Sequence, residues 1–123
     1  MNVQVVDGSG DTFGAVNGLG NLIIGYNENT VSALRTGSHN LVVGYNHEYT
    51  SFAGLVAGLW NSITGPSASV SGGFQNEASG NSSTVSGGSS GTASNNGASI
   101  SGGYDRWVVD SHDWCGGALI QDD

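Results

Sequence analysis

Short apolar phrases that end in glycine recur along this chain. Three copies, Ser69–Gly73, Thr84–Gly88 and Ser99–Gly103, follow each other at a spacing of fifteen residues. Looser copies precede them at residues 20–27, 38–46 and 54–61. Self-similarity at a short fixed period indicates a repeat architecture in which each unit is one coil of a stack.

The last glycine of each phrase gives the period. The steps between these glycines are 19, 14, 15, 15, 15 and 14 residues, and the glycines are Gly25, Gly44, Gly58, Gly73, Gly88, Gly103 and Gly117. We expect the first six to mark turns or close approaches of the backbone, since glycine accepts conformations that other residues avoid. The longer first step predicts an outward loop at residues 28–35.

A second phrase lies between the glycines, at residues 61–65, 76–80 and 91–95. Each coil should therefore hold two short strands, and no segment has the apolar spacing of a helix. The predicted fold is an all-β parallel β-roll, or β-solenoid, of about seven coils with 14–15-residue repeats. Residues 2–6 alternate in polarity and predict one further strand, followed by turn residues 7–11.

Inward-facing positions follow from the alternation of side chains along a strand. Aligned on the last glycine, the first large apolar residue of each phrase is predicted to face inward, with the residue two further on. Together with Ile63 from the second phrase, this gives a core ladder of Leu22, Ile24, Leu41, Val43, Leu55, Ile63, Val70, Val85 and Ile100. In the middle coils the second inward position falls on Gly72, Gly87 and Gly102, so Gly87→Val should be more disruptive than Ser89→Val.

The residue after each aligned glycine is usually large. Tyr26, Tyr45, Leu59, Phe74 and Tyr104 occupy this position, and Ser89 is the exception. Such residues should form a stripe along one corner of the stack. The stripe could fill its own corner, contact a partner subunit or bind a ligand, and the subunit interface is our preferred interpretation.

The chain is predicted to be one module of residues 1–123. It comprises an N-terminal strand and loop (1–19), repeat coils (20–103) and a C-terminal cap (104–123). The cap is expected because terminal repeats need atypical closing residues. Trp107 and Trp114 are the candidates for closing the end of the stack.

Composition limits the classes of partner that this chain can bind. Ten acidic residues face two basic ones, which gives a formal net charge of −8. Such a surface lacks the Lys and Arg that bind phosphate backbones or anionic lipid. We therefore expect no nucleic-acid partner, and no apolar run is long enough to insert this fragment in a membrane. A chain whose core is thin and rich in glycine would gain stability by associating with other copies of itself.

Candidate chemistry is sparse. Residues 111–113 read Ser-His-Asp, but adjacent residues cannot form a catalytic triad. The Asp7–Asp11 segment resembles the opening of a calcium loop without its remaining ligands. Cys115 is interpreted as a small buried residue. We therefore expect no enzyme activity, catalytic residue, metal or cofactor. The fifteen-residue spacing does not fit a hexapeptide acyltransferase, and no Thr-x-Thr row suggests ice binding.

The phrases resemble a known family. Ser69-Val70-Ser71-Gly72-Gly73 and its copies, with Ala78 and Ala93 in the second phrase, are similar to the YadA-type head β-roll repeats of trimeric autotransporter adhesins. Similar repeat tips occur in other bacterial surface or phage-tail-like fibres. The likeness covers residues 40–104 best, and its middle copies differ by having glycine where the family usually has an aliphatic residue.

The resemblance implies a homotrimer displayed outside the cell on a bacterial surface. The expected function is a structural and adhesive fibre module whose loops attach to a receptor, a surface or a glycan. The alternative is a spacer without a ligand or a self-assembling fibre subunit.

Overall fold

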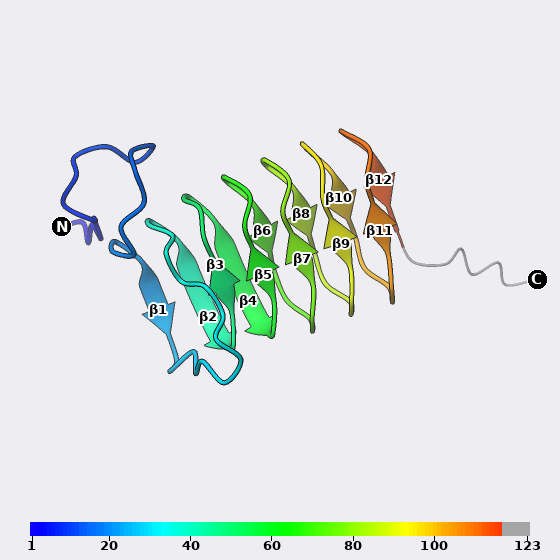
Figure 1. The fold of residues 1–123 in the computed structure, drawn as a ribbon, viewed down its shortest axis with the longest axis horizontal. Helices are drawn as coiled ribbons and strands as arrows, with labels where there is room; N and C mark the ends of the chain where they lie inside the picture. The colour runs from blue at the N-terminus through cyan, green and yellow to red at the C-terminus, as the bar shows by residue number, and fades with distance from the viewer. Residues whose placement is uncertain (117–123) are drawn as a thin grey trace, which may run out of the picture.

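The computed structural model describes residues 1–116 and shows an all-β solenoid (Figure 1). Short strands stack along one axis in about six turns, and the repeat is close to fifteen residues. No helix occurs in residues 1–116. Accordingly, no described helix is long and apolar enough to span a membrane.

The strands form two parallel sheets on opposite sides of a thin core. The seven-stranded sheet has the order β1 (Leu22–Ile24), β2 (Leu41–Tyr45), β4 (Leu55–Leu59), β6 (Ser69–Val70), β8 (Thr84–Val85), β10 (Ser99–Ile100) and β12 (Trp114–Cys115). The five-stranded sheet has the order β3 (Glu48–Tyr49), β5 (Ser62–Ile63), β7 (Glu77–Ala78), β9 (Thr92–Ala93) and β11 (Trp107–Val108). Each strand therefore pairs with its equivalent in the next turn.

Backbone hydrogen bonds between turns hold the stack together. The amide of Leu55 donates to the carbonyl of Ala68 at 3.2 Å, and the amide of Ser69 donates to Ser83 at 2.9 Å. The same pattern repeats at Thr84 and Ser99. Since two-residue strands bury little by themselves, this ladder and the continuous core must supply most of the stability.

The core is one file of apolar side chains from each sheet. The seven-stranded sheet contributes Val42, Val56, Val70, Val85 and Ile100, and the other sheet contributes Tyr49, Ile63, Ala78, Ala93 and Val108. Ala68 and Ala98 complete the cluster, and Cys115 packs against it. The middle turns pair one valine with one alanine, so the roll is thin there.

The expected core ladder is correct in the later turns and wrong in the earlier ones. Ile63, Val70, Val85 and Ile100 are buried, but Leu22, Ile24 and Leu41 are exposed, and Val43 and Leu55 are only half-buried. Strand register places Val42, Val56 and Val70 in one file, with Ile23 as its first member. A shift of one residue moves every side chain to the opposite face of a strand.

The shift arises from one extra residue in the later phrases. Gly58 lies against Gly73, although Val56 precedes Gly58 by two residues and Val70 precedes Gly73 by three. When the phrases are aligned on their last glycine, the strand residues of the early and later phrases are therefore out of step by one position. The extra residue is accommodated around Gly72, where an added Cβ would meet no atom within 4 Å.

Close approach occurs at the last glycine of the phrases that end in Gly44, Gly58, Gly73 and Gly88, and not at the residue before it, whereas at Gly25 an added Cβ would lie 3.5 Å from the nearest backbone atom. Gly58, Gly73 and Gly88 have φ of 103°, 88° and 89°, and a Cβ on Gly58 would lie 2.5 Å from the carbonyl oxygen of Gly73. Around Gly72, Gly87 and Gly102 the space is open within 4 Å. The expected inward placement of these three is wrong, and so is the reason for expecting Gly87→Val to be disruptive.

Each turn also bends through left-handed corners that are not glycine. One corner holds Asn46, Trp60, Gln75, Ser90 and Asp105, all with φ between 53° and 60°. A second corner holds His39, Ala53, Ser67, Ser82 and His112. A β-carbon is disfavoured in this region, although Asn and Asp accept it more readily, so the stack imposes the conformation on residues such as Trp60 and Ala53.

The ends of the chain differ from expectation. Residues 2–6 form no strand and are exposed, since no strand pairs with them in the described part of the chain. The loop between β1 and β2 projects beyond the stack, as expected for residues 28–35 (Figure 1). Residues 104–116 form another regular turn, and residues 117–123, with Gly117, lie outside the described residues.

Trp107 and Trp114 do not close the end of the stack. Trp107 is in register with Thr92 and Trp114 with Ser99, so both lie in outward-facing rows. Their exposed fractions are 71% and 69%. Within the described residues, the last turn is closed by no aromatic side chain, and the predicted role of these two residues is wrong.

Candidate interaction surfaces

The corner stripe is an exposed apolar ridge along the solenoid. Isolated parallel bridges join Leu59 to Phe74, Phe74 to Ser89 and Ser89 to Tyr104, so these positions stack directly. Leu59, Phe74, Tyr104 and Tyr26 are exposed, and Tyr45 is half-buried. The stripe therefore does not fill the corner of its own coil.

Backbone bonds fix the stripe. The amide of Leu59 donates to Gly73 at 3.0 Å, while the carbonyl of Leu59 accepts from Gln75 at 3.2 Å. Phe74 is held in the same way by Gly88 and Ser90. The ridge therefore stands on a rigid edge, which limits the conformational entropy that a partner would need to remove on binding.

The outer face of the seven-stranded sheet changes character along the stack. Its first row runs Leu22, Leu41, Leu55, Ser69, Thr84, Ser99 and Trp114 in register. The N-terminal half is apolar and the following part carries hydroxyl groups. Apolar exposed surface is thus concentrated on the early turns and continues along the corner stripe.

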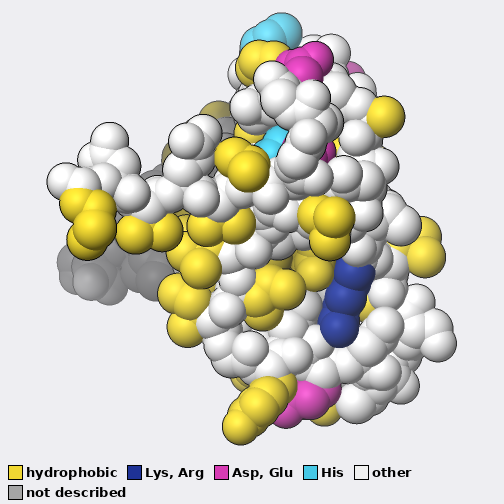
Figure 2. Space-filling model, turned by 90° about the vertical axis from the view of Figure 1, so that its left-hand side faces the viewer, with side chains coloured by type: hydrophobic (Ala, Val, Ile, Leu, Met, Phe, Trp, Pro, Cys, Tyr) yellow, Lys and Arg dark blue, Asp and Glu magenta, His cyan; other side chains and the backbone are white. Residues whose placement is uncertain are grey.

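The N-terminal end of the stack is an open edge. Figure 2 views the molecule from the end that carries β1 and shows apolar side chains gathered there. Leu22, Ile23 and Ile24 are all exposed, because β1 is the outermost strand of its sheet. Residues 1–19 form a loop beside the stack, and Phe13 packs edge-on against Phe52 at 5.6 Å between ring centroids.

A buried polar ladder runs inside the corner. It consists of Asn27, His47, Asn61 and Asn76, and all four are buried. The side-chain oxygen of Asn61 accepts the amide of Asn76 at 2.8 Å, and its Nδ2 donates to the carbonyl oxygens of Ala57 and Gly73. His47, Asn61 and Asn76 each satisfy backbone groups of two turns that would otherwise be unpaired in the interior, whereas Asn27 accepts only the amide of His47.

The polar ladder ends at Asn76, because the equivalent residue of the next turn is a glycine. Asn76 Oδ1 accepts the amide of Gly91 at 2.8 Å, but Gly91 has no side chain with which to continue. The second phrase begins with Asn61 and Asn76, and their role in this ladder was not predicted. The signal was the residue three positions after the aligned glycine, which is His47 after Gly44, Asn61 after Gly58 and Asn76 after Gly73.

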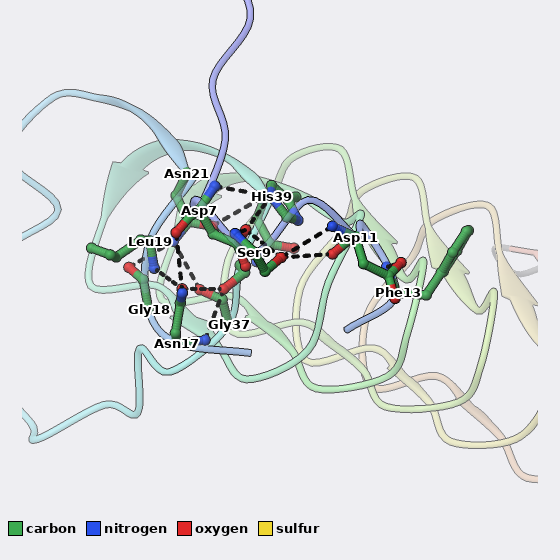
Figure 3. A network of polar contacts seen from close by, with 12 residues as sticks. Asp7, Ser9, Asp11, Phe13, Asn17, Gly18, Leu19, Asn21, Gly37 and His39 are labelled. Carbon is green, nitrogen blue, oxygen red and sulfur yellow. Dashed lines mark hydrogen bonds and ion pairs between the residues drawn. The ribbon is translucent and has the colours of Figure 1, made fainter. Parts of the chain in front are cut away.

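A polar network ties the N-terminal loop to the first turns (Figure 3). The carboxylate of Asp7 accepts hydrogen bonds from the amide and hydroxyl of Ser9 at 2.8 and 2.6 Å, and His39 Nε2 lies 3.4 Å from Asp7 Oδ1. The bonds from Ser9 lower the pKa of the Asp7 carboxyl. Asp7, Asp11 and His39 help to line a hollow of about 310 Å³.

This network has the geometry of a loop anchor. Ser9 Oγ bonds to Asp7 and to the Asp11 carbonyl and makes no hydrogen bond with His39, so the three do not form a nucleophile and base. Within residues 1–116 no group of three or more His, Cys, Asp or Glu side chains is placed to hold a metal ion. Ser111, His112 and Asp113, the adjacent residues of catalytic-triad type, are all exposed.

Comparison with protein-family models, curated proteins and solved structures found no match.

Proposed function

We propose that this chain is a structural and adhesive module of an extracellular fibre on a bacterial surface, and that it acts as a homotrimer. The observation that carries the proposal is the exposed corner stripe on a rigid repeat rod. Large apolar ridges exposed along a whole molecule are unusual in monomers and mark interaction sites. The number three rests on the resemblance of the phrases to heads of trimeric autotransporter adhesins.

The adjoining outer face supports the same assignment. Leu22 and Leu41 are exposed beside Tyr26 and Tyr45, so the early turns offer the widest apolar area. Complete burial of a fully exposed leucine is worth about 1.5–3 kcal/mol, so Leu22 and Leu41, which are 50% and 36% exposed, would each contribute roughly a third to a half of that. Three rods joined along the stripe would bury several such side chains per chain, which compensates for the thin core. The projecting loop between β1 and β2 remains available for an outside partner.

Mutation of the stripe tests the association. Phe74→Ser and Leu59→Ser remove apolar side chains that are exposed in the single chain, so each should leave the fold intact and weaken the trimer. Val109→Ser is the matched control, since Val109 is 54% exposed and outside the stripe. Sedimentation equilibrium should show dissociation of the first two variants only. Equal association of all three would reject the stripe as the interface.

The alternative is a spacer or fibre subunit without an outside ligand. The regular, weakly charged stack favours such a role, because rods of this kind can serve purely as scaffolds. Binding of the intact module to a glycan panel and to cells separates the two functions. Saturable binding that requires residues of the loop 28–35 supports adhesion, and its absence leaves the spacer.

A further inference from the structure

His47 occupies a rung of the buried ladder that asparagine occupies in later turns. Its side chain is fully buried, and its amide is bonded to Asn27 Oδ1 at 2.7 Å. His47 Nδ1 accepts the amide of Asn61 at 3.2 Å, just as Asn61 Oδ1 accepts the amide of Asn76. The imidazole thus imitates an asparagine side chain, with the difference that it can bind a proton.

The two ring nitrogens require the neutral form. Nδ1 is an acceptor for Asn61, and Nε2 lies 3.0 Å from the carbonyl oxygen of Val43, so Nε2 carries the hydrogen. A neutral imidazole has one donor and one acceptor, whereas the imidazolium has two donors. Protonation would place an N–H group opposite the Asn61 amide and remove that bond.

The charged groups nearby do not stabilise an imidazolium. Arg35 is the nearest cation, and its Nε donates to the backbone carbonyl of His47 at 3.2 Å. Glu48 is the neighbour on β3, but its carboxylate oxygens accept from the Leu34 amide and the Ser62 hydroxyl. Tyr49 is buried on the same strand, and burial raises the pKa of its phenol. Burial, assisted by Arg35, lowers the pKa of His47.

We propose that His47 is an acid-sensitive rung at which the solenoid opens between the turn of β2 and β3 and the turn of β4 and β5. Protonation breaks the link to Asn61, which joins these two turns. The early turns carry Tyr26, Tyr45 and the exposed leucines of the outer face. Acid would therefore loosen the part of the molecule with the widest apolar surface, while the asparagine rungs of later turns stay intact.

The direction in which stability changes with pH follows from the lowered pKa of His47. Above the ordinary histidine pKa of about 6.5, neither the folded nor the unfolded chain holds a proton on this side chain. Below it the unfolded or opened chain binds the proton and the folded chain does not. The opening equilibrium constant should then rise toward tenfold for each further pH unit, until the folded-state pKa is reached.

Denaturation of the whole chain between pH 8 and pH 5 tests the rung. His47→Asn keeps the bonding pattern and removes the titration, and His112→Asn is the control because His112 is exposed. The wild type and the control should lose stability below pH 6.5 with a slope that H47N lacks. Parallel pH profiles of the wild type and H47N would overturn the proposal.

Hydrogen exchange in the wild-type chain gives a test that does not depend on a variant folding. The amide of Asn61 has His47 Nδ1 as its acceptor, and the amide of Asn76 has a side-chain oxygen. After correction for intrinsic rates, protection of Asn61 should fall by about tenfold per pH unit below 6.5, with Asn76 falling less. Equal changes at both amides would show that the rung does not open locally.

Discussion

Gly88 is the residue whose replacement should reveal the tight packing between turns most clearly. In Gly88→Ala the new Cβ would lie 2.8 Å from the amide nitrogen of Gly103 and still closer to its carbonyl oxygen. The backbone at Gly88 has φ of 89°, which side-chain-bearing residues rarely adopt. Strained conformation costs about 1–3 kcal/mol, and overpacking costs about 1–3 kcal/mol more.

The neighbouring Gly87 is the matched control. A Cβ there would meet nothing within 4 Å, and its φ is outside the left-handed region. Gly87→Ala should change stability by less than about 1 kcal/mol, and the loss of unfolded-state freedom favours a small gain.

Urea denaturation of both variants measures the difference. We expect Gly88→Ala to lose about 2–6 kcal/mol, a large share of the roughly 5–15 kcal/mol typical of a domain. The midpoint of Gly87→Ala should stay near that of the wild type. Equal midpoints for the two variants, or a greater loss in Gly87→Ala, would refute the placement of the close contact at the last glycine.

Four other substitutions probe the ladder, the corners and the core register. Asn76→Ala removes a buried acceptor of the Gly91 amide and two donor bonds, and should cost at least about 2 kcal/mol in urea denaturation. Gln75→Asn places a better residue at φ of 55° and should raise the melting midpoint, with a gain of up to about 1 kcal/mol. Val56→Ala should destabilise by about 2–3 kcal/mol, whereas Leu55→Ala, although it removes the larger side chain, should cost less. If Leu55→Ala lowered the melting temperature more than Val56→Ala, the register aligned on glycine would be the correct one.

The repeat period predicted the fold because it is recorded directly in the sequence. The fifteen-residue spacing of Val70, Val85 and Ile100 gave parallel stacking, two strands per turn and a thin core. The long step between Gly25 and Gly44 gave the projecting loop. These features depend only on spacing and polarity, which sequence shows without ambiguity.

The side-chain register in the early turns could not be read from glycine alignment. Leu41, Val42 and Val43 are all apolar, so polarity does not say which of them faces inward. The extra residue near Gly72 then shifts the alignment by one position, and a shift of one reverses the face. The corner residues Trp60, Gln75 and Ser90 were equally hidden, since left-handed backbone is imposed on them by stacking.

The interaction surfaces were predicted in part. The spacing placed Tyr26, Leu59 and Phe74 in one stripe, and the structure adds that the stripe is exposed in a single chain. Trp107 and Trp114 were assigned to a cap because of their size, although the strand register turns them outward. The ladder through His47, Asn61 and Asn76 was not predicted, because Asn61 and Asn76 were considered only as the first positions of the second phrase.

Native mass measurement of the chain tests the central claim that the exposed stripe joins copies of this solenoid. We expect a species of three times the 12.4 kDa chain mass that dissociates when Phe74 is replaced by serine. A stable 12.4 kDa monomer at every protein concentration would contradict it.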